Sequence, residues 1–313
     1  MPRFLHDLPE AKGIFEILAA ERHIPEEMVE KDYWIMHCLW GLQKNKLYFE
    51  MKGGSSLSKG WKCIDRFSED IDIRFEPTKE IKHRGDSKAS IESRLAFYND
   101  IAGKIQIPGV KVARNLHYDD DKARNGGISL IYKSHFSALP GLKQEVLLEV
   151  GFAHTTPNEP MDFSSWALER VLESGDDVVD TRARSIPCYN PEYTFVEKLQ
   201  TICRRFRQYR DRKDPTKDQP GKFLRHYYDL FRLMEVDRVK TFIGSSEYIA
   251  CKKDRIRGAD AVEFESKEAF KILDNATYKK FAEGYESMKA LWISPGPTFA
   301  EMMERIRDNN ARF

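Results

Sequence analysis

Patterns typical of β-strands are confined to the middle of this chain, and helical patterns lie on both sides of them. Five segments contain alternating or β-branched apolar residues, which favour strands: residues 47–51, 71–75, 110–118, 127–132 and 145–152. Residues 87–105 have helical spacing and lie between the second and the third of these segments. Strands interrupted by a helix predict a mixed α/β core.

Helical spacing dominates both ends of the chain. Before the first strand, apolar residues recur at this spacing from Ile14 to Leu39, with a break near Pro25. Beyond the last strand a charged loop is expected at residues 211–220. Further helices are expected through to the C-terminus, beginning with residues 162–173, 193–209 and 223–234.

Pro187 and Pro191 mark the change from the mixed core to the helical end. A length of 313 residues allows two domains. We therefore expect residues 1–185 to contain N-terminal helices and the α/β core, and residues 186–313 to form a C-terminal helical domain.

The composition excludes several classes of protein. Hydrophobic residues make up 41% of the chain, but no apolar run approaches the roughly 18–20 residues that span a bilayer. The N-terminus has no apolar core of a secretory signal, so we expect a cytoplasmic protein with no membrane partner. The five cysteines are scattered without a CxxC pair, which argues against a zinc site and a disulfide framework.

The charge is unevenly distributed although the net charge is only +1. Residues 204–222 contain eight Lys or Arg and three Asp. A local basic surface can bind phosphates even in a neutral protein. The same residues also fit a solvated helix face followed by a charged loop, and composition leaves both interpretations open.

A glycine-rich turn follows the first expected strand. Lys52 precedes Gly53 and Gly54, and Ser55 and Ser56 come next. Glycines allow backbone amides to approach a ligand closely, and the free N–H groups of a helix that begins here, and runs through residue 59, would favour an anion. Taken alone, the segment is more typical of an ordinary turn.

Two acidic residues alternate with isoleucine at the start of the second expected strand. Residues two apart in a strand share a face, so the side chains of Asp70 and Asp72 would project together, with Cα atoms roughly 6.5 Å apart. Like charges that close favour a cation between them, and oxygen ligands suit Mg²⁺. Glu149 lies in a strongly apolar strand, where a charge is costly unless it is paired or binds metal. A polar strand face and a salt bridge are the alternatives for these acids.

Charged residues recur on two later helices. Glu197 and Lys198 lie two helical turns before Arg205, on the same helix face. Arg225 and Asp229 are four residues apart and share a face of the next helix. Each of these pairs also fits a surface ion pair of little energetic value.

The motifs together resemble the AbiEii/AbiGii toxin family of DNA polymerase beta-like nucleotidyltransferases, which includes MenT-type toxins. Residues 52–59 resemble the family pattern KGGTxLxK, and residues 66–73 resemble RxSxDxDL. The Glu149 strand, the helix with Lys198, and the segment 225–230 follow in the family's order. Ser55 replaces the usual threonine, and the residues before Asp229 depart from the Lys-Asp pair of some members. The resemblance covers about residues 48–232, and the helices beyond about residue 240 lie outside it.

This resemblance implies an α+β nucleotidyltransferase core with a mixed sheet, which transfers a nucleoside monophosphate from an NTP to an acceptor. It implies Mg²⁺ or Mn²⁺ as cofactor, with Asp70, Asp72 and Glu149 as metal ligands. Glu149 would also help to deprotonate the acceptor, Lys198 would neutralise phosphate charge, and Asp229 would orient Lys198 or the nucleotide. Nucleotide-binding residues would be Lys52, Gly53, Gly54, Ser55, Ser56, Arg66 and Lys198.

The same resemblance implies the toxin of a type IV-like toxin–antitoxin or phage abortive-infection system. RNA, above all tRNA, is the expected acceptor, and a cognate antitoxin protein is the expected partner. A protein or small-molecule acceptor, and a non-catalytic nucleotide-binding regulator, are the alternatives.

Overall fold

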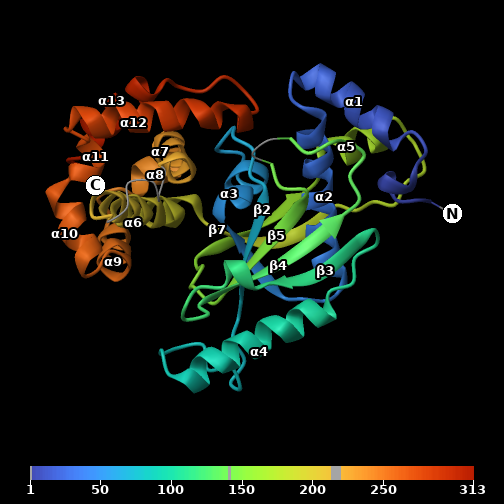
Figure 1. Cartoon of the computed structure of the whole chain (residues 1–313), viewed down its shortest axis with the longest axis horizontal. Coiled ribbons are helices and arrows are strands. Elements are labelled where there is room, and N and C mark those ends of the chain that lie inside the picture. The colour runs from blue at the N-terminus through green and yellow to red at the C-terminus, as the bar shows by residue number, and fades with distance from the viewer. Residues whose placement is uncertain (1, 140–141, 213–219) are drawn as a thin grey trace. The chain divides into compact units, whose positions relative to one another are not determined.

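The computed structural model describes residues 2–139, 142–212 and 220–313 (Figure 1). The chain forms two compact units. The first contains the residues up to Trp61 together with Phe67–Tyr189, and the second contains Lys62–Arg66 and Asn190–Phe313. No helix in the described part of the chain combines the length and the apolar character that crossing a bilayer requires.

The first unit is built on a mixed sheet of seven strands in the order β3-β4-β5-β2-β1-β7-β6. Its central pair, β2 and β5, is parallel, as is the pair β1 and β7, and the other neighbours are antiparallel. The strands are β1 (Phe49–Lys52), β2 (Asp70–Phe75), β3 (Val110–Asn115), β4 (Asn125–Tyr132), β5 (Glu145–Gly151), β6 (Asn158–Phe163) and β7 (Ala183–Tyr189).

Helix α2 (Glu26–Lys44) supplies much of the core behind this sheet (Figure 1). Every residue from Met28 to Leu42 is buried, and the helix contacts β2, β5 and β7. A helix that is buried on all sides in this way is a core helix rather than a surface one. Each fully buried Leu, Ile or Phe side chain contributes about 1.5–3 kcal/mol. The sheet is therefore fixed from one side by α2.

Shorter helices complete the first unit. Ser87 caps α4 (Lys88–Lys104), because its hydroxyl accepts a hydrogen bond from the backbone N–H of Ser90 at 3.2 Å. The elements are η1 (Leu5–Asp7), α1 (Ala11–Arg22), α3 (Gly53–Ser55), the π-helical turn η2 (Ser56–Gly60), α4 (Lys88–Lys104), η3 (Leu116–Tyr118) and α5 (Trp166–Glu173).

The predicted mixed α/β fold is confirmed, but two predicted elements need correction and two strands were not predicted. The strand expected at residues 110–118 ends at Asn115, and a 3-10 turn follows it. The helix expected from residue 162 begins at Trp166, because the Ser165 side chain caps it and the residues up to Phe163 belong to β6. Strands β6 and β7 were not predicted.

Pro187 explains why strand β7 was not predicted and why the expected domain boundary was placed too early. Proline has no backbone N–H to donate to a neighbouring strand, so it usually indicates the end of a strand. Pro187, however, lies opposite Pro160 of β6, which also has no backbone N–H. Cys188 pairs with Met51 of β1, which keeps β7 in the first sheet. The expected division between residues 185 and 186 therefore falls inside β7, whereas the first unit runs to Tyr189.

The second unit is helical, as its sequence pattern indicates. Helix α6 (Pro191–Arg210) contacts α7 (Gly221–Leu233), α8, α9, α10 and α11, and α7 contacts α12 and α13. Buried apolar residues such as Phe195, Leu199 and Ile202 follow the helical repeat on α6. The remaining elements are α8 (Asp237–Phe242), α9 (Ser246–Arg255), α10 (Ala259–Ser266), α11 (Glu268–Lys271), α12 (Asn275–Glu286), η4 (Ser287–Leu291) and α13 (Phe299–Asn309).

Candidate active site

Three carboxylates lie on one face of the central strand pair. Asp70 and Asp72 are partly exposed, and they alternate along β2 with the fully buried Ile71 and Ile73. In the parallel register between β2 and β5, Asp72 lies directly opposite Glu149. The sequence predicts the first two acids as a pair and the family resemblance adds Glu149, and the register of the sheet places Glu149 beside Asp72.

The electrostatics of Glu149 reflect this crowding. The negative charge of Asp72, then burial and then the charge of Asp70 raise the pKa of Glu149 from 4.5 to about 8. Lys52, which faces Asp72 from β1, acts in the opposite direction. Glu149 therefore holds a proton at neutral pH unless another positive charge joins the site.

The acids fit a divalent cation in part. Asp72 and Glu149 provide neighbouring oxygen donors of the type that Mg²⁺ and Mn²⁺ prefer, and their mutual repulsion is the kind that a cation relieves. Asp70 is engaged differently, because its Oδ1 lies 3.6 Å from the Lys143 ammonium. Within residues 2–139, 142–212 and 220–313, no group of three or more His, Cys, Asp or Glu side chains is placed to hold a metal ion. The predicted three-ligand metal site is thus not assembled in this conformation.

The glycine turn approaches the acids closely. Gly53 has a φ of +76°, and a Cβ atom on it would lie 1.9 Å from Oδ2 of Asp72. No other residue type can occupy this position without displacing the carboxylate. The turn therefore brings the backbone of residues 53–54 next to the acids.

Ser55 and Ser56 hold this turn in place. Ser55 is buried and its hydroxyl donates to the backbone carbonyl of Asp70 at 2.5 Å. Ser56 is also buried and its hydroxyl donates to the carbonyl of Gly53 at 2.9 Å. The predicted donation from these hydroxyls to phosphate would require each of them to change partner. In the observed arrangement they connect the turn to the start of β2.

Three consecutive charged residues of α2 lie at the back of this site and were not predicted as part of it. Glu30, Lys31 and Asp32 are each at most 1% exposed. A buried charge is costly unless it is paired and hydrogen-bonded. Three consecutive charged residues between apolar residues of one helix were therefore the pattern that could have predicted specific partners for them.

Each of the three holds a different segment. Glu30 accepts from the hydroxyl of Ser134 and the backbone N–H of His135. Lys31 donates to Glu69 at 3.3 Å and to the carbonyl of Lys143 at 2.6 Å. Thus Lys31 connects α2 to the residue before Asp70 and to the segment that leads into β5.

Asp32 anchors the end of the glycine turn. It accepts from the ammonium of Lys59 at 2.5 Å and from the backbone N–H of Trp166 at 2.9 Å. The Lys59 ammonium also lies 4.0 Å from the centre of the Trp166 ring. Burial raises the pKa of Asp32, and the charge of Lys59 opposes that rise.

A second group of predicted residues lies in the second unit. Asp229 is fully buried and accepts two hydrogen bonds from Arg66, at 2.6 and 2.8 Å. Its Oδ2 also lies 2.7 Å from the ammonium of Lys198. Arg66 was predicted to bind nucleotide, but here its guanidinium is buried and grips Asp229 in the bidentate geometry that suits a carboxylate.

This buried cluster is strongly polarised. Burial disfavours the charge on Asp229, but the positive charges of Arg66 and Lys198 outweigh it and hold the pKa of Asp229 well below its usual value. Burial, with the charges of Lys198 and Arg225, lowers the pKa of His226 well below its usual value. Neutral His226 can then accept from Lys198, whose Nζ lies 3.4 Å from its Nδ1. The Lys198 ammonium is thus held in place by two neighbours.

The basic stretch at residues 204–222 is partly engaged in ion pairs. Arg207 pairs with Asp260 at 2.7 Å, and Arg210 pairs with Glu263 at 2.8 Å. These contacts favour the structural interpretation for the part of the stretch that is described, whereas residues 213–219 lie outside the described chain.

The structure therefore collects the predicted residues into two groups. Glu149 and the residues from the turn and β2 come together in the first unit: Lys52, Gly53, Gly54, Ser55, Ser56, Asp70 and Asp72. Arg66, Lys198 and Asp229 come together in the second.

Comparison with known proteins supports the assignment from the motifs. A search of curated proteins found no match. The family model described as nucleotidyl transferase AbiEii toxin, type IV TA system, matches residues 35–305. This match corrects the narrower limits drawn from the motifs, since it includes helices beyond residue 240 and most of α2. It also contains every predicted site residue. The chain therefore belongs to the AbiEii family of nucleotidyl transferase toxins, which act in type IV toxin–antitoxin systems.

Proposed function

We propose that this nucleotidyl transferase moves a nucleoside monophosphate from an NTP to an RNA acceptor, specifically tRNA, with Mg²⁺ or Mn²⁺ as cofactor. The observation that carries the proposal is the pair Asp72 and Glu149, side by side in register, with Asp72 in contact range of Gly53. Family membership supports an NTP substrate and an antitoxin partner. The proposal places the reaction in the cytoplasm, where NTPs and tRNA are found.

The reaction asks for positioning and charge neutralisation. An acceptor hydroxyl oxygen bonds to the α-phosphorus, the bond from that phosphorus to the bridging oxygen breaks, and pyrophosphate leaves. Asp72 and Glu149, with Asp70 after a side-chain rotation, would hold the divalent cation. When bound, it supplies positive charge to the oxygens of the transferring phosphoryl group.

The chain's own residues supply the remaining roles. The backbone amides of Gly53 and Gly54 would receive the phosphates, and Lys52 would add positive charge next to them. Glu149 holds a proton at neutral pH while no further positive charge is in the site. It would take the proton of the acceptor hydroxyl after the bound cation has lowered its pKa.

The family resemblance gives Lys198 of the second group a role in the reaction. Lys198 would neutralise charge that develops on the phosphates. Asp229 orients Lys198, and Arg66 in turn keeps Asp229 ionised. This assigns Arg66 a positioning role in place of the predicted contact with nucleotide.

To test the proposal, the protein is incubated with each of the four α-labelled NTPs, Mn²⁺ or Mg²⁺, and total cellular RNA, protein and metabolites. The measurement is which of these molecules carries the label. The proposal expects label on RNA in the size range of tRNA and none with Asp72→Asn. Label on protein or on a small molecule would show a different acceptor. Binding of NTP without release of pyrophosphate would show a regulator and would contradict the proposal.

A further inference from the structure

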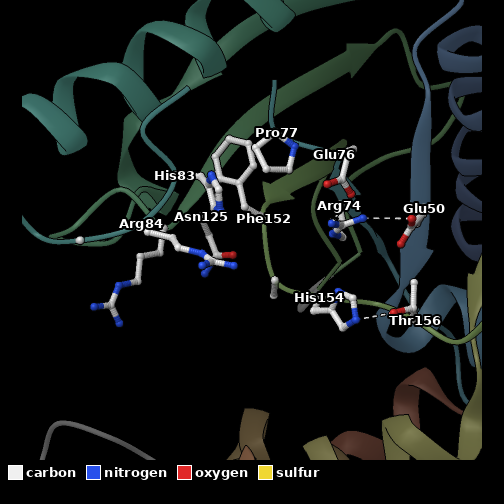
Figure 2. Close-up of a pocket in the computed structure, with 13 residues that line it drawn as sticks. Glu50, Arg74, Glu76, Pro77, His83, Arg84, Asn125, Phe152, His154 and Thr156 are labelled. Atoms are coloured by element: carbon white, nitrogen blue, oxygen red, sulfur yellow. Dashed lines mark hydrogen bonds and ion pairs between the residues drawn. The ribbon is translucent and has the colours of Figure 1, made fainter. Parts of the chain in front are cut away.

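A pocket of about 890 Å³ opens in the first unit, and none of the predicted site residues lines it. Figure 2 shows His83, Arg84 and Phe152 on one side of this pocket and Glu50, His154 and Thr156 on the other. Its volume lies within the range of pockets that bind ligands of drug or nucleotide size. We call it the strand-end pocket, because it lies where β2 and β5 end.

The strand-end pocket continues the face that carries the acids. Arg74 lines it and lies two residues after Asp72 on β2, so the two side chains project from the same face. Glu50 lies two residues before Lys52 on β1, and it faces Arg74 in the register just as Lys52 faces Asp72. One repeat of the pleat, about 6.5–7 Å, therefore separates the pocket from the acids along both strands.

The glycine turn, the acids and the pocket follow one another along this face, and this order suggests separate places for the NTP and the acceptor. The glycine turn begins where β1 ends at Lys52, and the pocket lies at the other side of the acids, by Glu50. In phosphoryl transfer the attacking and leaving oxygens lie roughly in line on opposite sides of the phosphorus. If the pyrophosphate leaves toward the turn, the acceptor enters from the pocket. This step rests on the proposed function.

The lining suits a nucleotide of a single strand. The Arg74 guanidinium is already neutralised by Glu50, at 3.0 Å, and by Glu76. Arg84 is exposed and has no acidic partner among the residues that the structure describes, so it can receive a phosphate.

An aromatic platform lies next to Arg84. The Phe152 ring is partly exposed and is backed by Phe97 and Tyr98, with ring centres 5.2 and 5.8 Å away. His83 lies 6.2 Å from Phe152 on the pocket side. Rings fixed in this way are the stacking surface that proteins offer to unpaired bases.

We propose that the strand-end pocket binds the single-stranded end of the acceptor RNA, with a phosphate on Arg84 and a base against Phe152 and His83. The acceptor hydroxyl then reaches the acids one pleat repeat away. The pocket thus selects a flexible strand end rather than a duplex.

The test measures binding without chemistry, so that it is independent of whether nucleotide transfer occurs. Fluorescence anisotropy follows a labelled single-stranded RNA of about ten nucleotides on the full chain, in chelator and without NTP. Arg84→Glu is expected to weaken binding about tenfold, and Phe152→Leu about fivefold with an unchanged melting temperature. Arg84→Lys should retain most of the affinity, because it keeps the charge.

Lys111→Glu is the matched control. Lys111 is exposed on β3 of the same unit and does not line the pocket, yet the substitution makes the same change of charge. Binding within about twofold of wild type is expected. Equal loss in the Lys111 and Arg84 variants, or tight binding that ignores both Arg84→Glu and Phe152→Leu, would overturn the proposal. So would tighter binding of the same RNA when it is annealed into a duplex.

Discussion

Replacing Glu149 with glutamine tests the crowding of the three acids directly. In the folded chain the pKa of Glu149 is raised from 4.5 to about 8, first by the charge of Asp72 and then by burial. The unfolded chain releases this proton near the ordinary value. Proton binding by Glu149 therefore contributes fully to the free energy of unfolding below about pH 4.5. This contribution decreases as the pH rises and is lost above about pH 8. The amide has no proton to lose and shows no such fall.

The magnitude follows from the same two values. The difference of 8 − 4.5, or 3.5 pKa units, corresponds to at most about 5 kcal/mol. The Glu149 side chain is partly exposed, so solvent screens the repulsion. We therefore expect Glu149→Gln to be more stable than wild type by about 2–3 kcal/mol at alkaline pH and nearly equal to it near pH 4.5.

Urea unfolding in chelator, followed by circular dichroism at about pH 5 and about pH 9, measures this difference. Glu173→Gln, at an exposed position of α5, is the control and should follow wild type at both values. A stability difference between wild type and Glu149→Gln that is independent of pH, or that widens toward low pH, would show that the pKa of Glu149 is not raised in the folded chain. Added Mn²⁺ should restore stability to wild type at about pH 9 more than to the glutamine variant.

Three further substitutions test the glycine turn and the buried ion pairs. Gly53→Ala should abolish nucleotide transfer, because its Cβ would lie 1.9 Å from the nearest carboxylate oxygen, whereas Gly13→Ala, with open space around it, should leave the rate and the melting temperature unchanged or slightly raised. Lys31→Met should lower the free energy of unfolding by about 3 kcal/mol in urea, since it leaves a carboxylate without its buried partner, while Lys12→Met at an exposed pair should cost under about 1 kcal/mol. Asp229→Asn should lower stability by about 3–5 kcal/mol near neutral pH. Because the pKa of Asp229 is held below normal, this loss should shrink as the pH falls below about 4, and urea titrations at several pH values would show a constant loss if the ion pairs were irrelevant.

The sequence predicted those parts of the fold that depend on local pattern. The alternation around Asp70 and Asp72 indicated a strand with both acids on one face, and the structure confirms that strand. Strand β7 was not predicted because it contains Pro187, and this proline lies opposite a second proline, Pro160 of β6. Local propensity carries no information about such a partner.

Long-range pairing decided the rest of the site. Glu149 reaches Asp72 through a parallel register, which the sequence does not specify over so long a separation. Arg66 was expected to bind nucleotide because it lies in the family-like motif at residues 66–73, yet residues 62–66 belong to the second unit and Arg66 binds Asp229. The buried charges of α2 were visible as residues, but their separate anchoring roles required the structure.

Whether Asp72 carries the chemistry is measured by the initial rate of label transfer from an α-labelled NTP to RNA. The comparison is between Asp72→Asn and Asp100→Asn. Asp72 faces Glu149 and the glycine turn, whereas Asp100 forms an exposed pair with Lys104 on α4. We expect Asp72→Asn to lower the rate at least about a hundredfold and Asp100→Asn to leave it within about twofold of wild type. A wild-type rate in Asp72→Asn would contradict the assignment of the chemistry to this carboxylate group.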